Sequence, residues 1–178
     1  MTGMQWPDGT THLRSRAMKI FKRKIDPRQI AAIIFDFDGV FTDNKVTVTE
    51  NGQESVICNR ADGLGVKMLR EKQIPLLILS TEQNRVVAAR ADKLALEHVQ
   101  GVADKKAVLI AYCAARAMDL QKVMYVGNDL NDLEAMKAVG YPAAPKDAHP
   151  EIRRIAKYII KCKGGEGVVR ELAENWIR

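Results

Sequence analysis

The feature that most constrains this chain is a short apolar run that ends abruptly in two aspartates and a glycine. Residues 31–35 read Ala-Ala-Ile-Ile-Phe, which is typical of a strand buried on both faces of a parallel sheet, and Asp36, Asp38 and Gly39 follow at once. Ligands of open α/β sheets bind just beyond the carboxyl ends of the strands. Two carboxylates placed there repel each other unless a cation lies between them. The run is also compatible with an ordinary turn, so later strand ends must decide between the two interpretations.

The rest of the chain alternates short apolar strands with helices. The expected strands after the first lie at 75–79, 97–99, 123–126 and 157–161, with a further short one within 142–150, and the expected helices lie at 62–72, 83–94, 105–117, 133–139, 151–156 and 168–177. Asp62 is expected to cap the first of these helices. Two β-branched segments, 45–49 and 54–58, flank an Asn-Gly pair and predict a hairpin. This pattern predicts an α/β fold: a Rossmann-like three-layer sandwich with a parallel sheet, plus a protruding β-hairpin.

The positive charge of the chain is concentrated at its N-terminus. The formal net charge is +6, and residues 1–29 hold seven of the 28 Lys and Arg residues but only two of the 22 Asp and Glu residues. We therefore expect residues 1–29 to be a flexible basic extension, with a short helix possible over 14–25, and residues 30–178 to form one domain. Attraction to nucleic acid or a membrane is the alternative for such an extension. No aromatic-interleaved basic surface supports a nucleic-acid partner.

The cysteines and the hydropathy pattern bear on the compartment. Cys58, Cys113 and Cys162 are odd in number and far apart, and they match neither a zinc nor a redox spacing. No signal peptide or membrane-length apolar run is apparent. We therefore expect a cytoplasmic protein without a membrane partner.

Three later stretches follow the order of a known set of motifs. Ser80 ends the strand at 75–79, Lys105 opens the helix at 105–117, and Gly-Asn-Asp-Leu-Asn-Asp at 127–132 follows the strand at 123–126. Together with the run at 36–42, they resemble the haloacid dehalogenase superfamily of phosphohydrolases. The resemblance extends from about residue 30 to the C-terminus. It implies that residues 30–178 are a hydrolase domain of this type.

The resemblance implies a role for each motif residue. Asp36 would be the nucleophile that forms an aspartyl-phosphate, and Asp38 the general acid and base. Mg²⁺ would be held by Asp36, the main-chain carbonyl of Asp38, Asn128, and Asp129 directly or through water. Ser80 would donate to a phosphoryl oxygen, and Lys105 would neutralise the developing charge. Thr42 and Asp132 would support these groups, Asp132 by holding Lys105. The structural alternatives are surface roles for Ser80 and Lys105 and helix capping by Asp129 and Asn131.

The short intervals between the motifs narrow the resemblance to one branch. Neither the hairpin region nor residues 81–104 leaves room for a cap domain. This pattern and the stretches 38–43, 60–65 and 164–171 resemble the capless sugar-acid phosphatases, which act on 3-deoxy-octulosonate 8-phosphate or on nine-carbon keto-sugar acid 9-phosphates. The resemblance implies a homotetramer and an eight- or nine-carbon substrate. The candidate substrate-binding residues are Arg60, Glu82, Lys93 and Arg170; ordinary solvated or paired surface positions are the alternative for all four.

Two further functions compete with this interpretation. The first is a catalytically weak oligomerisation module, of the kind fused to cytidylyl-sialate synthetases. Asn128 would suit it, because many members of the superfamily have an aspartate at this position. The second is a phosphatase for polynucleotide ends, which the basic extension would suit.

Overall fold

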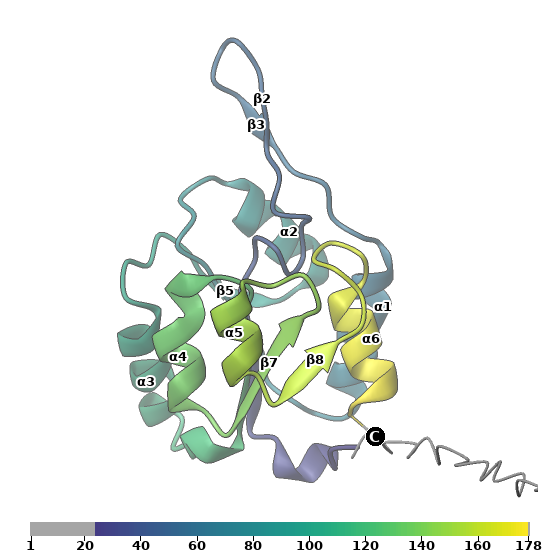
Figure 1. Ribbon diagram of the computed structural model, residues 1–178, viewed down its shortest axis with the longest axis vertical. Coiled ribbons are helices and arrows are strands. Elements are labelled where there is room, and N and C mark those ends of the chain that lie inside the picture. The colour runs from purple at the N-terminus through teal and green to yellow at the C-terminus, as the bar shows by residue number, and fades with distance from the viewer. Residues whose placement is uncertain (1–23, 178) are drawn as a thin grey trace, which may run out of the picture.

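The computed structural model describes residues 24–177, and its centre is a six-stranded parallel sheet (Figure 1). The strand order is β5-β4-β1-β6-β7-β8. The strands are β1 (Ala32–Phe35), β4 (Leu76–Leu79), β5 (Glu97–Val99), β6 (Val123–Val126), β7 (Tyr141–Pro145) and β8 (Tyr158–Ile160). The predicted strands of this sheet are all present: β7 begins one residue before the stretch 142–150, and the others lie within one residue of their expected bounds.

Helices cover both faces of the sheet, and every residue of the central strands β1, β4 and β6 is buried. The helices are α1 (Ala61–Glu71), α2 (Val86–Leu94), α3 (Lys105–Ala115), α4 (Leu133–Ala138), α5 (Pro150–Ile155) and α6 (Val168–Asn175), with short 3-10 turns at Pro27–Gln29, Leu120–Lys122 and Leu130–Asp132. In β1, Ile33 and Phe35 join the apolar core under α1, α2 and α6, while Ala32 and Ile34 join the core under α3, α4 and α5. The predicted three-layer α/β sandwich is confirmed.

The pairing of β1 brings the motif residues to one edge of the sheet. Phe35, the last residue of β1, lies beside Ile78 of β4 and Val126 of β6. The residues that follow these parallel strands therefore emerge side by side at the carboxyl edge. This is the edge at which Asp36, Ser80 and the 127–132 loop meet.

The predicted hairpin is present and projects well beyond the body of the domain (Figure 1). Its paired strands, β2 (Thr47–Val48) and β3 (Glu54–Ser55), are shorter than the predicted segments 45–49 and 54–58. Nothing larger than this hairpin and α1 separates β1 from β4. Among residues 24–177 there is thus no cap domain, as predicted.

The start of α2 differs from the prediction. The helix begins at Val86 and not at Gln83. The Glu82 carboxylate accepts the N–H groups of Gln83 and Asn84, and the Asn84 amide oxygen accepts the N–H of Val86. Side chains that satisfy these backbone donors stabilise a turn in place of the first helical turn.

Most of the basic extension lies outside the described residues. This applies to residues 1–23, and so to most of the helix considered over 14–25. Ile25 is buried and its N–H donates to the Trp176 carbonyl at 2.7 Å, so the described residues just before position 30 pack against the C-terminal end. The domain boundary at residue 30 stays a prediction.

Across residues 24–177, no helix combines the length and the apolar character needed to span a bilayer.

Asp62 does not cap α1, and that prediction was wrong. The N-cap position of α1 is Arg60, whereas Asp62 lies inside the helix and is fully buried. Its Oδ1 accepts the N–H groups of Val169 at 2.9 Å and Arg170 at 3.2 Å, at the first turn of α6. Asp62 therefore ties the C-terminal helix to α1, and its Oδ2 has no hydrogen-bond partner among the described residues.

This buried carboxylate gives a testable pH dependence of stability. Burial raises the pKa of Asp62 from 3.8 to about 6, although the two N–H bonds lower it. The folded state then favours the protonated form, so the stabilising contribution is complete below pH 3.8 and is lost as the pH rises through 6. We expect the unfolding free energy of Asp62→Asn, relative to that of the wild type, to rise by about 2 kcal/mol between about pH 4 and pH 7, because pH 4 already lies above the unfolded pKa of 3.8. Urea unfolding at both pH values measures this, with the exposed Asp92→Asn as control. Equal pH slopes for wild type and Asp62→Asn would contradict it.

Candidate active site

A buried ion-pair cluster lies at the end of β1. Lys105 Nζ contacts Asp36 Oδ1 and Asp132 Oδ1, both at 2.7 Å, and all three side chains are at most 5% exposed. Asp104 positions Lys105 because it caps α3 by accepting the N–H of Ala107. The structure thus brings together three predicted site residues that lie far apart in the sequence.

Asp132 organises the loop that follows β6. Its Oδ2 accepts the N–H groups of Asn128 at 2.9 Å and Asp129 at 3.3 Å, while its Oδ1 also accepts the hydroxyl of Tyr125 at 2.9 Å. Sequence reasoning missed Tyr125, which is fully buried within β6. Tyr125 lies within the apolar run 123–126, and this pattern predicted only a buried strand residue without a polar contact. Asp132 therefore fixes both Lys105 and the backbone around Asn128.

The cluster holds two carboxylates for one ammonium group. Burial would lower the pKa of Lys105, but Asp36 and Asp132 outweigh it and raise that pKa, so Lys105 stays charged. Burial and the nearby Asp132 raise the pKa of Asp36, against the effect of Lys105. The excess negative charge favours a further cation beside Asp36.

Asp38 lies at the mouth of the site and is held by the loop itself. Its Oδ1 accepts the Thr42 hydroxyl at 3.1 Å, and the same hydroxyl oxygen accepts the N–H groups of Gly39 and Asn44 at 3.2 Å. Burial raises the pKa of Asp38, as do Glu82 and Glu54, while the Thr42 bond lowers it. A carboxyl with a raised pKa that shares a pocket with a second carboxylate, Asp36, suits proton transfer near neutral pH.

Asn128 presents an unpaired oxygen to the same pocket. The residue is 7% exposed, and its Oδ1 has no hydrogen-bond partner among the described residues. Gly39 makes room for it: φ is +74° there, and a Cβ atom at this position would overlap the Asn128 side chain. Such a cradle, with Asp36 and Asp38 on its other side, provides the oxygen donors that Mg²⁺ prefers. Within residues 24–177, no three His, Cys, Asp or Glu side chains group as metal ligands, so an ion here would need Asn128 or a main-chain carbonyl.

The remaining lining of this pocket, the candidate catalytic pocket, is polar. The residues around it are Asp36, Asp38, Asn44, Thr81, Asn128, Asp129 and Asn131. Asp129 also caps the turn at Leu130–Asp132. The capping role considered for this residue is therefore present, and it is compatible with binding a metal. Ser80 is buried at the strand end, where its Oγ accepts the N–H of Glu82 at 3.0 Å and keeps its own proton to donate. Asn44 and Thr81, which line the pocket from loops, were not among the predicted site residues. Asn131, in the 3-10 turn, was predicted only as part of the 127–132 motif.

Comparison with known proteins agrees with this geometry. Residues 70–172 match the family of haloacid dehalogenase-like hydrolases. The 3-deoxy-D-manno-octulosonate 8-phosphate phosphatase of Yersinia pestis is 33% identical over 146 residues, which cover 82% of this chain and 78% of that protein. This chain belongs to the haloacid dehalogenase-like hydrolases. Within that family it falls in the branch of the sugar-acid phosphatases, as the resemblance predicted.

Two other relatives of this haloacid dehalogenase-like hydrolase are informative. The 3-deoxy-D-manno-octulosonate 8-phosphate phosphatase of Moraxella catarrhalis, solved with a magnesium ion, a phosphate ion and a KDO molecule, has a TM-score of 0.79 and 29% identity, and the match covers 83% of this chain and 86% of that one. The N-acylneuraminate cytidylyltransferase of Oncorhynchus mykiss is 29% identical over 153 residues, which cover 84% of this chain but 35% of that protein.

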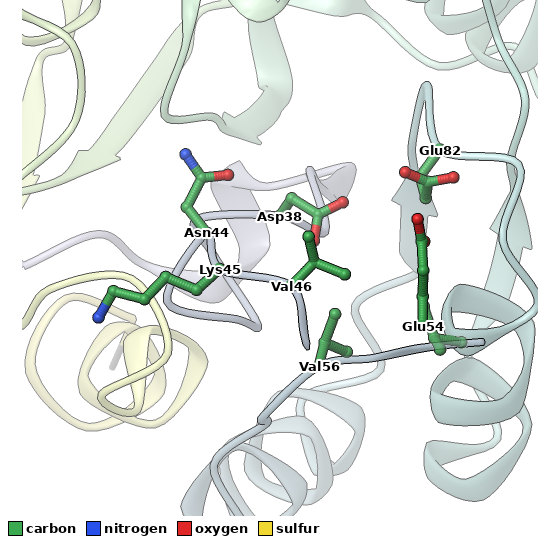
Figure 2. A pocket seen from close by; sticks show the side chains of 8 residues that line it. Asp38, Asn44, Lys45, Val46, Glu54, Val56 and Glu82 are labelled. Atoms are coloured by element: carbon green, nitrogen blue, oxygen red, sulfur yellow. The ribbon is translucent and has the colours of Figure 1, made fainter. Parts of the chain in front are cut away.

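The four predicted substrate-binding residues are not all near the site of their own chain. Glu82 lines a pocket with Asp38 (Figure 2). Lys93 lies in a separate pocket between α1 and α2, beside Arg70 and Leu94. Arg60 is exposed at the start of α1, and Arg170 pairs with Glu174 on α6. The roles of these four residues in substrate binding stay predictions. The spacing of the motifs could not show where their side chains would lie once the helices pack.

Proposed function

We propose that this hydrolase is a Mg²⁺-dependent phosphatase that removes phosphate from an eight- or nine-carbon keto-sugar acid through an aspartyl-phosphate. The observation that carries the proposal is the Asp36 carboxylate, held by Lys105 in a pocket that also contains Asp38 and the unpaired oxygen of Asn128. The phosphatases among its relatives support the substrate class.

The residues divide the reaction into two displacements. An Asp36 oxygen attacks phosphorus, and the bond from phosphorus to the ester oxygen breaks as Asp38 gives that oxygen its proton. Asp38 then takes a proton from water, which attacks phosphorus and releases phosphate and free Asp36. Lys105 and the Ser80 hydroxyl offset charge on the phosphoryl oxygens. Mg²⁺, when bound by Asp36, the Asp38 carbonyl and Asn128, with Asp129 as a further candidate, supplies positive charge to the phosphoryl group.

Phosphate release from a panel of eight- and nine-carbon keto-sugar acid phosphates tests this function. We expect turnover with Mg²⁺, loss of turnover with a chelator, and recovery when Mg²⁺ is restored. The oligomerisation module remains the second candidate, because a cytidylyltransferase is among the relatives. No Mg²⁺-stimulated turnover of any member of the panel would favour that module over the phosphatase.

We also propose a homotetramer with contacts at the hairpin. Val46, Val48 and Ile57 on the hairpin segment are 52%, 60% and 77% exposed, which is high for large apolar side chains. We expect a tetramer by light scattering at micromolar concentration, and a smaller species for Ile57→Asp. Ile110→Asp, on the exposed side of α3, is the control. A monomeric wild type, or an unchanged mass for Ile57→Asp, would contradict the proposal.

The three free cysteines suit the reducing cytoplasm, which we propose as the location.

A further inference from the structure

A second pocket opens directly from the catalytic one, beneath the hairpin. It has a volume of about 240 Å³ and is lined by Asp38, Asn44, Lys45, Val46, Glu54, Val56, Glu82 and Val86. Asp38 and Asn44 line both pockets. The carboxyl that would protonate the ester oxygen therefore stands at the junction. If phosphate enters the catalytic pocket, the alcohol part of the ester lies in this second pocket.

One wall of the second pocket consists of two facing carboxylates. Figure 2 shows Glu54, from the hairpin, and Glu82, from the loop after β4, pointing toward one another. Asn84 holds both: its Nδ2 donates to Glu54 Oε2 at 2.8 Å, and its backbone N–H donates to Glu82 Oε1 at 2.8 Å. The second oxygen of each carboxylate has no hydrogen bond to any residue of 24–177, so it is available to a ligand.

The charge around this wall is not compensated from within the pocket. Lys45 is the only cation among the lining residues, it pairs with Asp43 at 3.2 Å, and it extends away from Glu54 and Glu82 (Figure 2). Carboxylates only accept hydrogen bonds, and a like charge beside them is disfavoured. A ligand part at this wall must therefore carry O–H or N–H donors, while Val46 and Val56 suit its carbon skeleton.

We propose that Glu54 is a specificity-determining residue, which together with Glu82 binds hydroxyl or ammonium groups of the leaving alcohol and keeps its carboxylate away from this wall. This inference rests on the proposed phosphatase function. It gives the hairpin a second task besides assembly, since one of its paired residues reaches the substrate. Asn84 is a positioning residue that acts through Glu54.

A ratio of rates tests the role of Glu54. The ratio compares kcat/KM for the best sugar-acid phosphate of the panel with kcat/KM for p-nitrophenyl phosphate, whose leaving group offers no donors to this wall. We expect Glu54→Leu to lower the ratio by about tenfold or more, mainly through KM, since it removes hydrogen bonds to a charged group. Glu54→Gln keeps an acceptor and should lower it less. Asn84→Ala removes the hydrogen bond that holds Glu54 and should also lower the ratio. This variant tests the role of Glu54 if Glu54→Leu does not fold.

The matched control is Glu50→Leu, because Glu50 is exposed in the hairpin turn and lines neither pocket. An unchanged ratio in folded Glu54→Leu, or a wild type that prefers p-nitrophenyl phosphate to every sugar phosphate, would overturn the inference alone. A wild type that hydrolyses no phosphate ester with Mg²⁺ would overturn the proposed function as well.

Discussion

Asp36→Asn is expected to lower phosphate release by about 10⁴-fold or more, because an amide cannot form the aspartyl-phosphate. The fold should persist, since Asn keeps an acceptor for the Phe37 N–H and leaves Lys105 paired with Asp132. Steady-state phosphate release and thermal unfolding measure the two effects. With one carboxylate fewer around one ammonium group, the melting temperature should not fall.

Asp43→Asn is the control for this substitution. Asp43 lies in the same loop, and its exposed side chain pairs with Lys45. It should retain wild-type turnover. Wild-type turnover in Asp36→Asn, or equal losses in both variants, would refute the assignment of Asp36 as nucleophile.

Gly39→Ala is expected to have the second-largest effect. The positive φ of +74° strains any L residue, and the new methyl group would overlap Asn128. Displacement of Asn128 should raise the Mg²⁺ concentration needed for half-maximal activity and lower the unfolding free energy by about 1–3 kcal/mol. A Mg²⁺ titration of activity and urea unfolding measure these changes.

Gly52→Ala separates backbone strain from the overlap. Gly52 has a φ of +79° in the hairpin turn, and a Cβ atom added there would meet no atom of the described residues within 4 Å. This variant should lose about 1 kcal/mol of unfolding free energy without any change in Mg²⁺ dependence. If Gly39→Ala also leaves the Mg²⁺ dependence unchanged, the position of Asn128 does not depend on the space that Gly39 provides.

The strand ends explain how much could be predicted from the sequence. Buried apolar runs followed by Asp36, Ser80 and Gly127 predicted both the sheet and the edge at which these residues meet, because parallel strands place their carboxyl ends together. The resemblance to the haloacid dehalogenase superfamily implied in addition that Asp132 holds Lys105. The sheet and its edge needed only local pattern and topology, whereas this contact needed the resemblance.

What remained beyond the sequence depends on contacts between distant segments. Asp62 looked like a helix cap, but α6 packs against α1 and supplies the N–H groups that it accepts. The pattern predicted Glu54 only as a strand residue of the hairpin. In the structure, Asn84 donates to its carboxylate and holds it opposite Glu82. Lys93 was a candidate substrate-binding residue together with Glu82, yet it lines a different pocket, between α1 and α2. Side-chain direction after such packing is not encoded in motif spacing.

The most direct test of the proposed mechanism is the detection of a phosphoryl group on Asp36. Asp38→Asn should block activation of water, while an aryl phosphate, whose leaving group needs no proton, should still phosphorylate the enzyme. Acid quenching and mass spectrometry of peptides then locate the group. We predict a hydroxylamine-sensitive phosphoryl group on Asp36 in Asp38→Asn, and none when Asp36→Asn is added. Turnover by the wild type with no phosphoryl group on Asp36, or with one on another residue, would contradict the account.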